Sequence, residues 1–171
     1  MPSVAEKGKT EIRHKERVRN KIMIEFTSTQ IQDGCDTAVC VKQGFIKWII
    51  ESNDGVCEFL LKDGYASNVR ETLDEIKAKL AADTRSGEWQ LWWLDLQMEE
   101  NGKPYRILVN KDLVCQFYHD GSVTNVETYI EGAMKCPIFP ALNTYEDVKA
   151  QMEYDVFKHR RKKEKNPDVG I

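Results

Sequence analysis

The chain has 171 residues, of which 41% are hydrophobic and 31% are charged, and its formal net charge is −3. This composition suits a domain with a real core and excludes disordered, collagen-like, coiled-coil and disulfide-scaffold proteins. No stretch approaches the roughly 20 apolar residues of a membrane-spanning helix, so we expect no membrane as a partner. Positions 1–21 lack the apolar segment of a secretory signal, and the five cysteines have no paired spacing, which favours a reduced, cytoplasmic protein.

The charge is segregated along the chain. Residues 1–21 carry seven basic and three acidic side chains, and residues 158–171 carry six basic and two acidic, so each end has a net charge of +4. The remainder, 22–157, carries 12 basic and 23 acidic side chains, a net charge of −11. We therefore divide the chain into a flexible basic arm (1–21), a single α+β domain (22–157) and a basic C-terminal tail (158–171).

The first half of the domain predicts short strands followed by a helix. The strands are expected at 21–27, 37–42, 45–52 and 56–62, the last two joined by a hairpin around Asp54-Gly55. The apolar spacing then becomes helical, because Val69, Leu73, Ile76 and Leu80 lie at i, i+4, i+7 and i+11. Asn68 with Glu71 fits a capping pair, so we expect this helix to start near residue 68.

The second half begins with an ambiguous segment, 88–98. Trp89, Trp92 and Trp93 match helical spacing, yet aromatic residues at this density favour a strand. Asn101-Gly102 is a strong hairpin signal, so 88–98 is predicted to be a strand that pairs with 105–109. A further strand is expected at 113–119, a helix or a strand at 124–133, a loop at 135–142, and a second amphipathic helix from Asn143 or Thr144 to about 162.

The expected fold is therefore α+β, with antiparallel sheets built from hairpins and two main amphipathic helices. Residues 56–59, leading to Asp63-Gly64, resemble residues 114–117, leading to Asp120-Gly121. Residues 75–78 likewise resemble residues 147–150. These echoes suggest two pseudo-repeated βββα units at 37–82 and 88–157. The alternative is chance similarity, because short strands ending in Asp-Gly are common.

Signatures of common enzyme and metal classes are missing from the sequence. Gly8-Lys9-Thr10 resembles the end of a phosphate-binding loop, but Ser3 stands where that loop requires glycine. The residues that could in principle ligate zinc are Cys35, Cys40, Cys57, Cys115 and His119. Their spacing fits cysteines of a hydrophobic core better than a zinc site. We therefore expect no catalytic residue, no metal and no cofactor, which favours a protein that is not an enzyme.

The basic arms and the strand aromatics predict a nucleic-acid-associated binding protein. Cationic arms hold phosphates in a salt-sensitive manner, and an exposed strand aromatic can stack on an unpaired base. The expected contact residues are Lys7, Lys9, Arg13, Lys15, Arg17, Arg19, Trp92, Arg160, Arg161, Lys162 and Lys163. For any single tryptophan the competing interpretation is core packing, and for the arms it is simple solvation.

The acidic body leads to a second hypothesis, because it would repel a nucleic acid outside the arms. The alternative function is a protein-binding or inhibitory module whose acidic surface imitates nucleic acid toward a basic protein partner. An enzyme without a local motif signature is the second alternative. Homodimerisation is a further expectation, since the arms of one subunit could lie on the acidic body of another.

Overall fold

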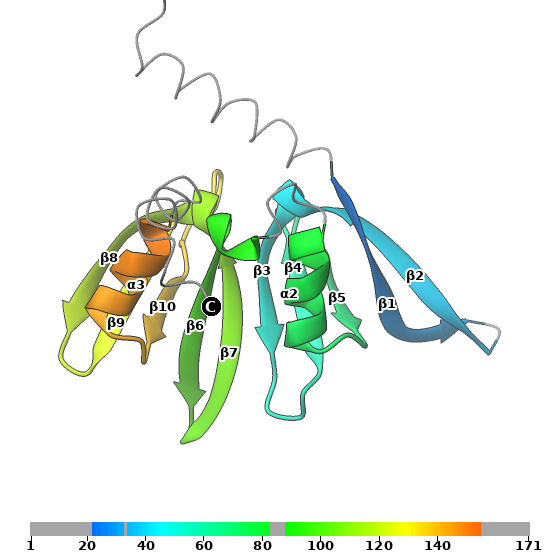
Figure 1. The fold of residues 1–171 in the computed structure, drawn as a ribbon, viewed down its shortest axis with the longest axis horizontal. Coiled ribbons are helices and arrows are strands. Elements are labelled where there is room, and N and C mark those ends of the chain that lie inside the picture. The colour runs from blue at the N-terminus through cyan, green and yellow to red at the C-terminus, as the bar shows by residue number, and fades with distance from the viewer. Residues whose placement is uncertain (1–21, 33, 83–87, 155–171) are drawn as a thin grey trace, which may run out of the picture.

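The computed structural model describes residues 22–32, 34–82 and 88–154, which form a mixed fold of antiparallel sheets and two α-helices (Figure 1). This confirms the expected α+β class. None of the described helices is long and apolar enough to cross a membrane. The basic arm, the basic tail and the last residues of the predicted second helix lie outside the described residues.

Seven strands form the larger sheet, in the order β2-β1-β5-β4-β3-β7-β6. They are β1 (Met23–Gln32), β2 (Cys35–Lys42), β3 (Ile46–Glu51), β4 (Cys57–Leu61), β5 (Ala66–Val69), β6 (Trp93–Glu100) and β7 (Lys103–Asn110). The smaller sheet has the order β10-β9-β8 and comprises β8 (Val114–Asp120), β9 (Val123–Thr128) and β10 (Ile138–Ala141). The helices are α2 (Leu73–Ala82) and α3 (Tyr145–Met152), and the 3-10 helices are η1 (Gln43–Phe45), η2 (Trp89–Leu91) and η3 (Lys111–Leu113).

β2 and β8 lie at opposite ends of this arrangement (Figure 1). The two sheets meet where β10 approaches β6, because Leu142 N–H donates to Gln97 O at 2.8 Å directly after β10. The β6–β7 hairpin turns at Asn101 and Gly102, whose φ angles are +52° and +75°. These positive angles are those of a tight hairpin turn, so the turn predicted from Asn-Gly is confirmed.

Two hydrophobic cores fill the space between sheets and helices. The first contains Leu73, Ile76 and Leu80 of α2, together with apolar side chains of β1 to β5. It also contains Trp93 and Leu108, which come from β6 and β7. The second core contains Val148 of α3 with side chains of β6, β7 and β9, and it receives Trp48 from β3. Each core therefore takes side chains from both halves of the chain, so neither half is packed by itself.

The aromatic segment 88–98 is not one strand. Residues 89–91 form η2, in which Trp92 N–H donates to Trp89 O at 3.2 Å, and β6 begins only at Trp93. Trp89 packs against the first core, and the Lys77 ammonium lies 4.6 Å from its ring centroid. The predicted strand was wrong at its start because the tryptophan density spans a 3-10 turn and a strand, both packed on the same core.

The first helix begins later than predicted. Val69 belongs to β5, which the sequence analysis missed, and α2 starts at Leu73. Its cap is a reciprocal pair: Glu75 N–H donates to Thr72 Oγ1 at 3.2 Å, and Thr72 N–H donates to Glu75 Oε2 at 2.8 Å. The Asn68–Glu71 capping pair was therefore wrong, because the Glu71 carboxylate accepts from the backbone of β1 instead.

Further differences concern the second half. The segment 135–142, predicted as a loop, contains the short strand β10 despite Pro137 and Pro140. The segment 124–133 is strand β9 only as far as Thr128, and α3 ends at Met152 rather than near 162.

The order of elements strand, strand, 3-10 helix, three strands, α-helix occurs twice, from Met23 to Ala82 and from Trp93 to Met152. The predicted repeat boundaries, 37–82 and 88–157, do not match this order. The predicted strand alignment paired β4 with β8, whereas the order of elements places β3 opposite β8. The helix alignment, 75–78 with 147–150, agrees with the order. The duplication itself stays a prediction at this point.

Candidate functional site

Of the residues predicted to contact nucleic acid, only Trp92 lies within the described part of the chain. It is half-buried, follows η2 and packs against the first core. Its carbonyl accepts a 2.9 Å hydrogen bond from Lys111 N–H. Trp92 is thus not a side chain displayed by a strand, and only part of its ring is open to a base.

The cysteines do not gather into a metal site in the described residues. There, no group of three or more His, Cys, Asp or Glu side chains is arranged to hold a metal ion. Cys57 is buried, and its burial, with the negative charges of Glu51 and Glu71, raises the pKa of its thiol to about 12. Cys35, Cys40 and Cys115 are exposed on strands at opposite ends of the molecule.

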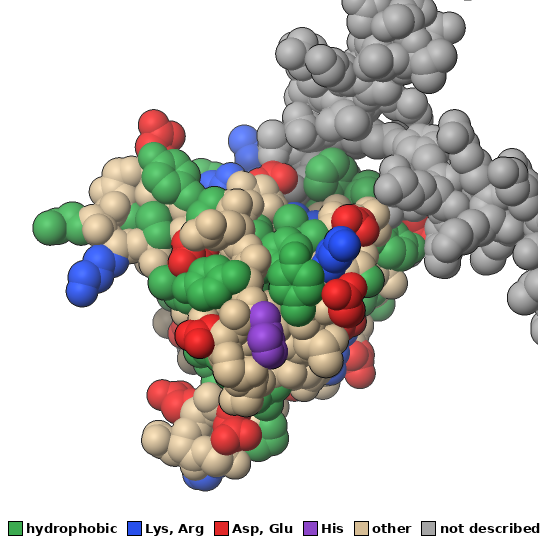
Figure 2. All heavy atoms as spheres, turned by 90° about the vertical axis from the view of Figure 1, so that its left-hand side faces the viewer, with side chains coloured by type: hydrophobic (Ala, Val, Ile, Leu, Met, Phe, Trp, Pro, Cys, Tyr) green, Lys and Arg blue, Asp and Glu red, His purple; other side chains and the backbone are tan. Residues whose placement is uncertain are grey.

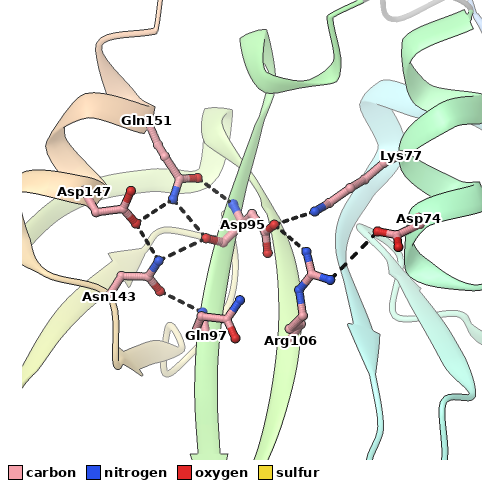
Figure 3. A network of polar contacts seen from close by, with 8 residues as sticks. All are labelled: Asp74, Lys77, Asp95, Gln97, Arg106, Asn143, Asp147 and Gln151. Carbon is pink, nitrogen blue, oxygen red and sulfur yellow. Dashed lines mark hydrogen bonds and ion pairs between the residues drawn. The ribbon is translucent and has the colours of Figure 1, made fainter.

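A charged cluster connects the two halves of the chain (Figure 3). One oxygen of Asp95 on β6 accepts from Lys77 Nζ of α2 at 2.5 Å and from an Arg106 guanidinium nitrogen of β7 at 2.7 Å. Arg106 also lies 3.9 Å from the Asp74 carboxylate of α2. The hydrogen bond that Arg106 donates to Asp95, opposed in part by burial, raises the pKa of Arg106. These charges neutralise one another, so the cluster is better suited to holding α2 against β6 and β7 than to chemical reaction.

Side-chain amides close the outer edge of β6. Gln97 N–H donates to Asn143 Oδ1 at 2.7 Å, and Asp95 N–H donates to Gln151 Oε1 at 2.8 Å. The amide nitrogens of Asn143 and Gln151 in turn donate to Asp95 O and to Asp147 Oδ2 (Figure 3). Asp147 thereby holds both amides in the orientation that β6 needs. Backbone groups that an edge strand would otherwise leave open are bonded to α3 and to the residue before its cap.

A charged pair does the same for β1. Thr27 N–H donates to both carboxylate oxygens of Glu71, at 2.8 and 3.0 Å. Lys79 Nζ donates to Glu25 O and to Glu71 Oε1, each at 2.7 Å. Burial alone would raise the pKa of Glu71, but the hydrogen bonds from Lys79 and from backbone N–H groups outweigh it, so its pKa is lowered.

Two strand edges at the ends of the sheets are not closed in this way. Among the described residues β8 has only β9 as a neighbouring strand, and β2 has only β1. Neither 37–41 in β2 nor 114–118 in β8 contains a charged residue or a proline, the usual protection of an edge strand. Figure 2 shows the β8 end, where apolar side chains lie among acidic ones. The sequence analysis missed these edges, although their uncharged runs were a visible signal.

Exposed apolar side chains lie on and near the smaller sheet. They are Tyr118, Tyr129, Met134, Ile138, Leu142 and Tyr145, from β8, β10, α3 and the segments between them. Phe117 and Tyr145 pack against each other with ring centroids 5.2 Å apart. A hydrogen bond to Glu127, followed by weak burial, raises the pKa of the Tyr118 phenol. The β8 end therefore combines an open backbone edge, apolar surface and acidic groups.

Comparison of the chain with protein-family models, with curated proteins and with solved structures found no match.

The Glu71 contacts predict an acid-dependent contribution to stability. Because the pKa of Glu71 is lowered in the folded state, its contribution is present above the ordinary value of about 4.3 and is lost as pH falls through the folded value. Glu71→Gln should lower the free energy of unfolding by about 1–3 kcal/mol at pH 7, since the charged acceptor of the Thr27 N–H and of the Lys79 ammonium is lost. Urea denaturation between pH 7 and 3 measures this difference.

The difference between wild type and Glu71→Gln should shrink toward pH 3. The matched control is Glu99→Gln, whose side chain is exposed on the β6–β7 hairpin and should leave stability near that of wild type. A wild-type advantage over Glu71→Gln that stays constant down to pH 3 would contradict the assigned role.

Proposed function

We propose that the protein is a non-enzymatic protein-binding module whose binding surface is the β8 end. The observation that carries this proposal is the open edge of β8, which carries the exposed Tyr118 and lies beside the exposed Tyr145 of α3. Isolated apolar side chains are normal on a surface, but exposed aromatic side chains beside an unpaired strand edge mark an interaction site. Exposed acidic side chains lie on β8 (Asp120), after β9 (Glu131) and on α3 (Glu146).

The binding mode that this edge favours is addition of a strand. A strand that pairs with β8 satisfies the outward backbone N–H and C=O groups, while side chains of alternate residues set specificity. Phe117 is half-buried and Tyr118 is 39% exposed, so both faces of β8 offer apolar contact at the pairing edge. Among the described residues, side chains close the free edges of β1 and β6, and β10 faces β6, to which Leu142 is bonded.

A second part of the proposal is that the domain is a tandem of two equivalent units, 23–82 and 93–152. The first hairpin has the same register in both: Glu25 pairs with Cys40, and Asp95 pairs with Leu108, each three residues into its strand. The next ladder has an irregularity at the same place, directly after its first pair. It falls between Ile46 and Trp48 in β3 and between Val114 and Gln116 in β8.

Hydrogen bonds outside the ladders support the same equivalence. Three backbone bonds recur, at the start of the 3-10 helix, after the fourth strand, and between the first strand and the residue after the fifth. In the first unit they join Gln43 N to Ile22 O (3.0 Å), Lys62 N to Phe45 O (2.9 Å) and Arg70 N to Thr27 O (2.8 Å). In the second they join Lys111 N to Trp92 O (2.9 Å), Tyr129 N to Leu113 O (2.8 Å) and Leu142 N to Gln97 O (2.8 Å).

This equivalence supports β8 as the binding edge. In the first unit the equivalent strand is β3, which already has a partner on that side, β7. The outer edge of this strand is therefore paired in the first unit, where β3 meets β7, and is open in the second unit, where β8 takes the place of β3.

A photo-crosslinking residue at Tyr118 tests the proposed binding surface. In cells that make the protein, irradiation should attach a protein partner at position 118, because the side chain is exposed at the pairing edge. The matched control is the same residue at Tyr65, which is exposed at the β4–β5 turn, away from the β8 end. Mass spectrometry identifies what is attached. Equal yields at the two positions, or no protein adduct at position 118, would overturn the proposed function.

Nucleic-acid binding by the basic arms is the second candidate, favoured by the net charge of +4 on each arm against −11 on the body. Fluorescence anisotropy with single-stranded DNA, duplex DNA and RNA tests it. Binding should weaken by about 10³-fold or more between 50 and 200 mM salt if some six phosphates are contacted. It should also be lost when the basic residues of 7–19 and 160–163 are replaced by serine. Salt-independent binding, or binding that survives the replacement, would contradict it.

A further inference from the structure

We propose that the partner of the β8 edge is a second copy of this chain, which docks through its β2 edge. This inference rests on the proposed function and names the partner of the same site. It follows from the pairing of β3 with β7, which joins the first unit to the second within the chain and is called the β3–β7 joint below. There, the third strand of one unit, β3, pairs with the second strand of the next unit, β7.

The β3–β7 joint gives the register of the proposed contact. It pairs Trp48 with Val109, Ile49 with Leu108, Ile50 with Ile107, and Glu51 with Arg106. β8 occupies the place of β3 in its unit, and β2 occupies the place of β7. Transferred to the free ends, the same register sets Gln116 opposite Val41 of the second copy, Phe117 opposite Cys40, Tyr118 opposite Val39, and His119 opposite Ala38.

Side chains that are buried at the β3–β7 joint have exposed counterparts at the free β2 edge, as expected if a second copy docks there. Trp93 and Leu108 are both fully buried in the first core, beneath α2. Their counterparts at the free end are Met23, which is 50% exposed, and Cys40, which is exposed. Met23 and Cys40 are apolar like Trp93 and Leu108, but none of the described residues buries them. A second copy would cover them with its α3 and β8, as α2 and β3 cover Trp93 and Leu108.

The β8 edge, which would receive the second copy, also has a side chain that is less buried than its counterpart in the first unit. Leu73 at the start of α2 is fully buried, whereas Tyr145 at the start of α3 is exposed. Tyr145 contacts Phe117 of β8, so it stands beside the edge that would receive Met23 and Cys40. An aromatic residue that is apolar in body and polar at its tip suits a surface that is covered in a complex.

Charge supports the same register. Across the joint, Lys77 lies five residues after the cap residue Thr72 and pairs with Asp95, the third residue of β6. Lys149 lies five residues after the cap residue Thr144, and Glu25 is the third residue of β1. Docking in the proposed register therefore brings Lys149 of one copy toward Glu25 of the next, reproducing the pair between α2 and β6.

The proposed contact is head-to-tail, because the two surfaces differ. A docked pair of copies leaves one β8 edge and one β2 edge free, so association continues into chains unless the geometry closes a ring. A two-fold dimer would instead pair β8 with β8 or β2 with β2. The register thus distinguishes this arrangement from other self-association.

Disulfide trapping tests the contact in the full chain. In a background with Cys35→Ser, Cys40→Ala and Cys115→Ser, the variant Ala38→Cys with His119→Cys places thiols on facing positions of different copies. Within one chain the two residues lie on opposite end strands and cannot meet. The control variant is Ala38→Cys with Asp120→Cys, which is out of register by one residue and turns the second thiol to the other face.

Mild oxidation should give covalent dimers and longer species, about tenfold more with the in-register pair than with the control, because pairing holds the thiols within bonding distance. Equal yields, or no covalent species, would overturn the inference. If position 118 meanwhile crosslinks to another protein, the proposed function stands and only the identity of the partner falls.

A charge exchange that needs no new cysteine provides the second readout. Glu25→Lys and Lys149→Glu should each weaken association measured by sedimentation, and the double variant should restore it. Failure of the double variant to recover association would overturn the assigned register.

Discussion

The pairing of β3 with β7 is the interaction on which the rest of the structure depends. It makes one sheet of strands from both halves of the chain. It also places Trp93 and Leu108 in the first core, where full burial of each side chain is worth about 1.5–3 kcal/mol relative to exposure. The same pairing brings Asp95 and Arg106 of the β6–β7 hairpin to Lys77 and Asp74 of α2. Without it, both cores would lose side chains and the charged contacts between this hairpin and α2 would be lost.

Closure of the strand edges within each half follows a common geometry with different chemistry. Next to β6 two amides, Asn143 and Gln151, bond to the backbone, whereas next to β1 the carboxylate of Glu71 and the ammonium of Lys79 do so. In both cases one partner precedes the helix cap and the other lies eight residues further along. This closure leaves β2 and β8 as the ends at which further pairing is available, which is why the proposed function is located there.

The sequence predicted the features that depend on local chemistry. Asn101-Gly102 predicted a hairpin because only a few residues accept its turn geometry, and the Ile76–Leu80 stripe predicted α2. It failed where long-range pairing decides: Val69 became a strand residue because β1 and β4 both pair with it. The candidate site was missed for the same reason. Charge counts directed attention to the arms, whereas the uncharged runs at 37–41 and 114–118 identify strand edges only once the strand order is known.

Amide hydrogen exchange at two protein concentrations, about a hundredfold apart, tests the central claim that the free edges reproduce the β3–β7 joint. At the higher concentration we expect stronger protection of amides in 37–41 and 115–119 together, with β4 unchanged because it is paired on both sides at every concentration. Protection that is independent of concentration in both edges, or that rises in one edge without the other, would contradict the account.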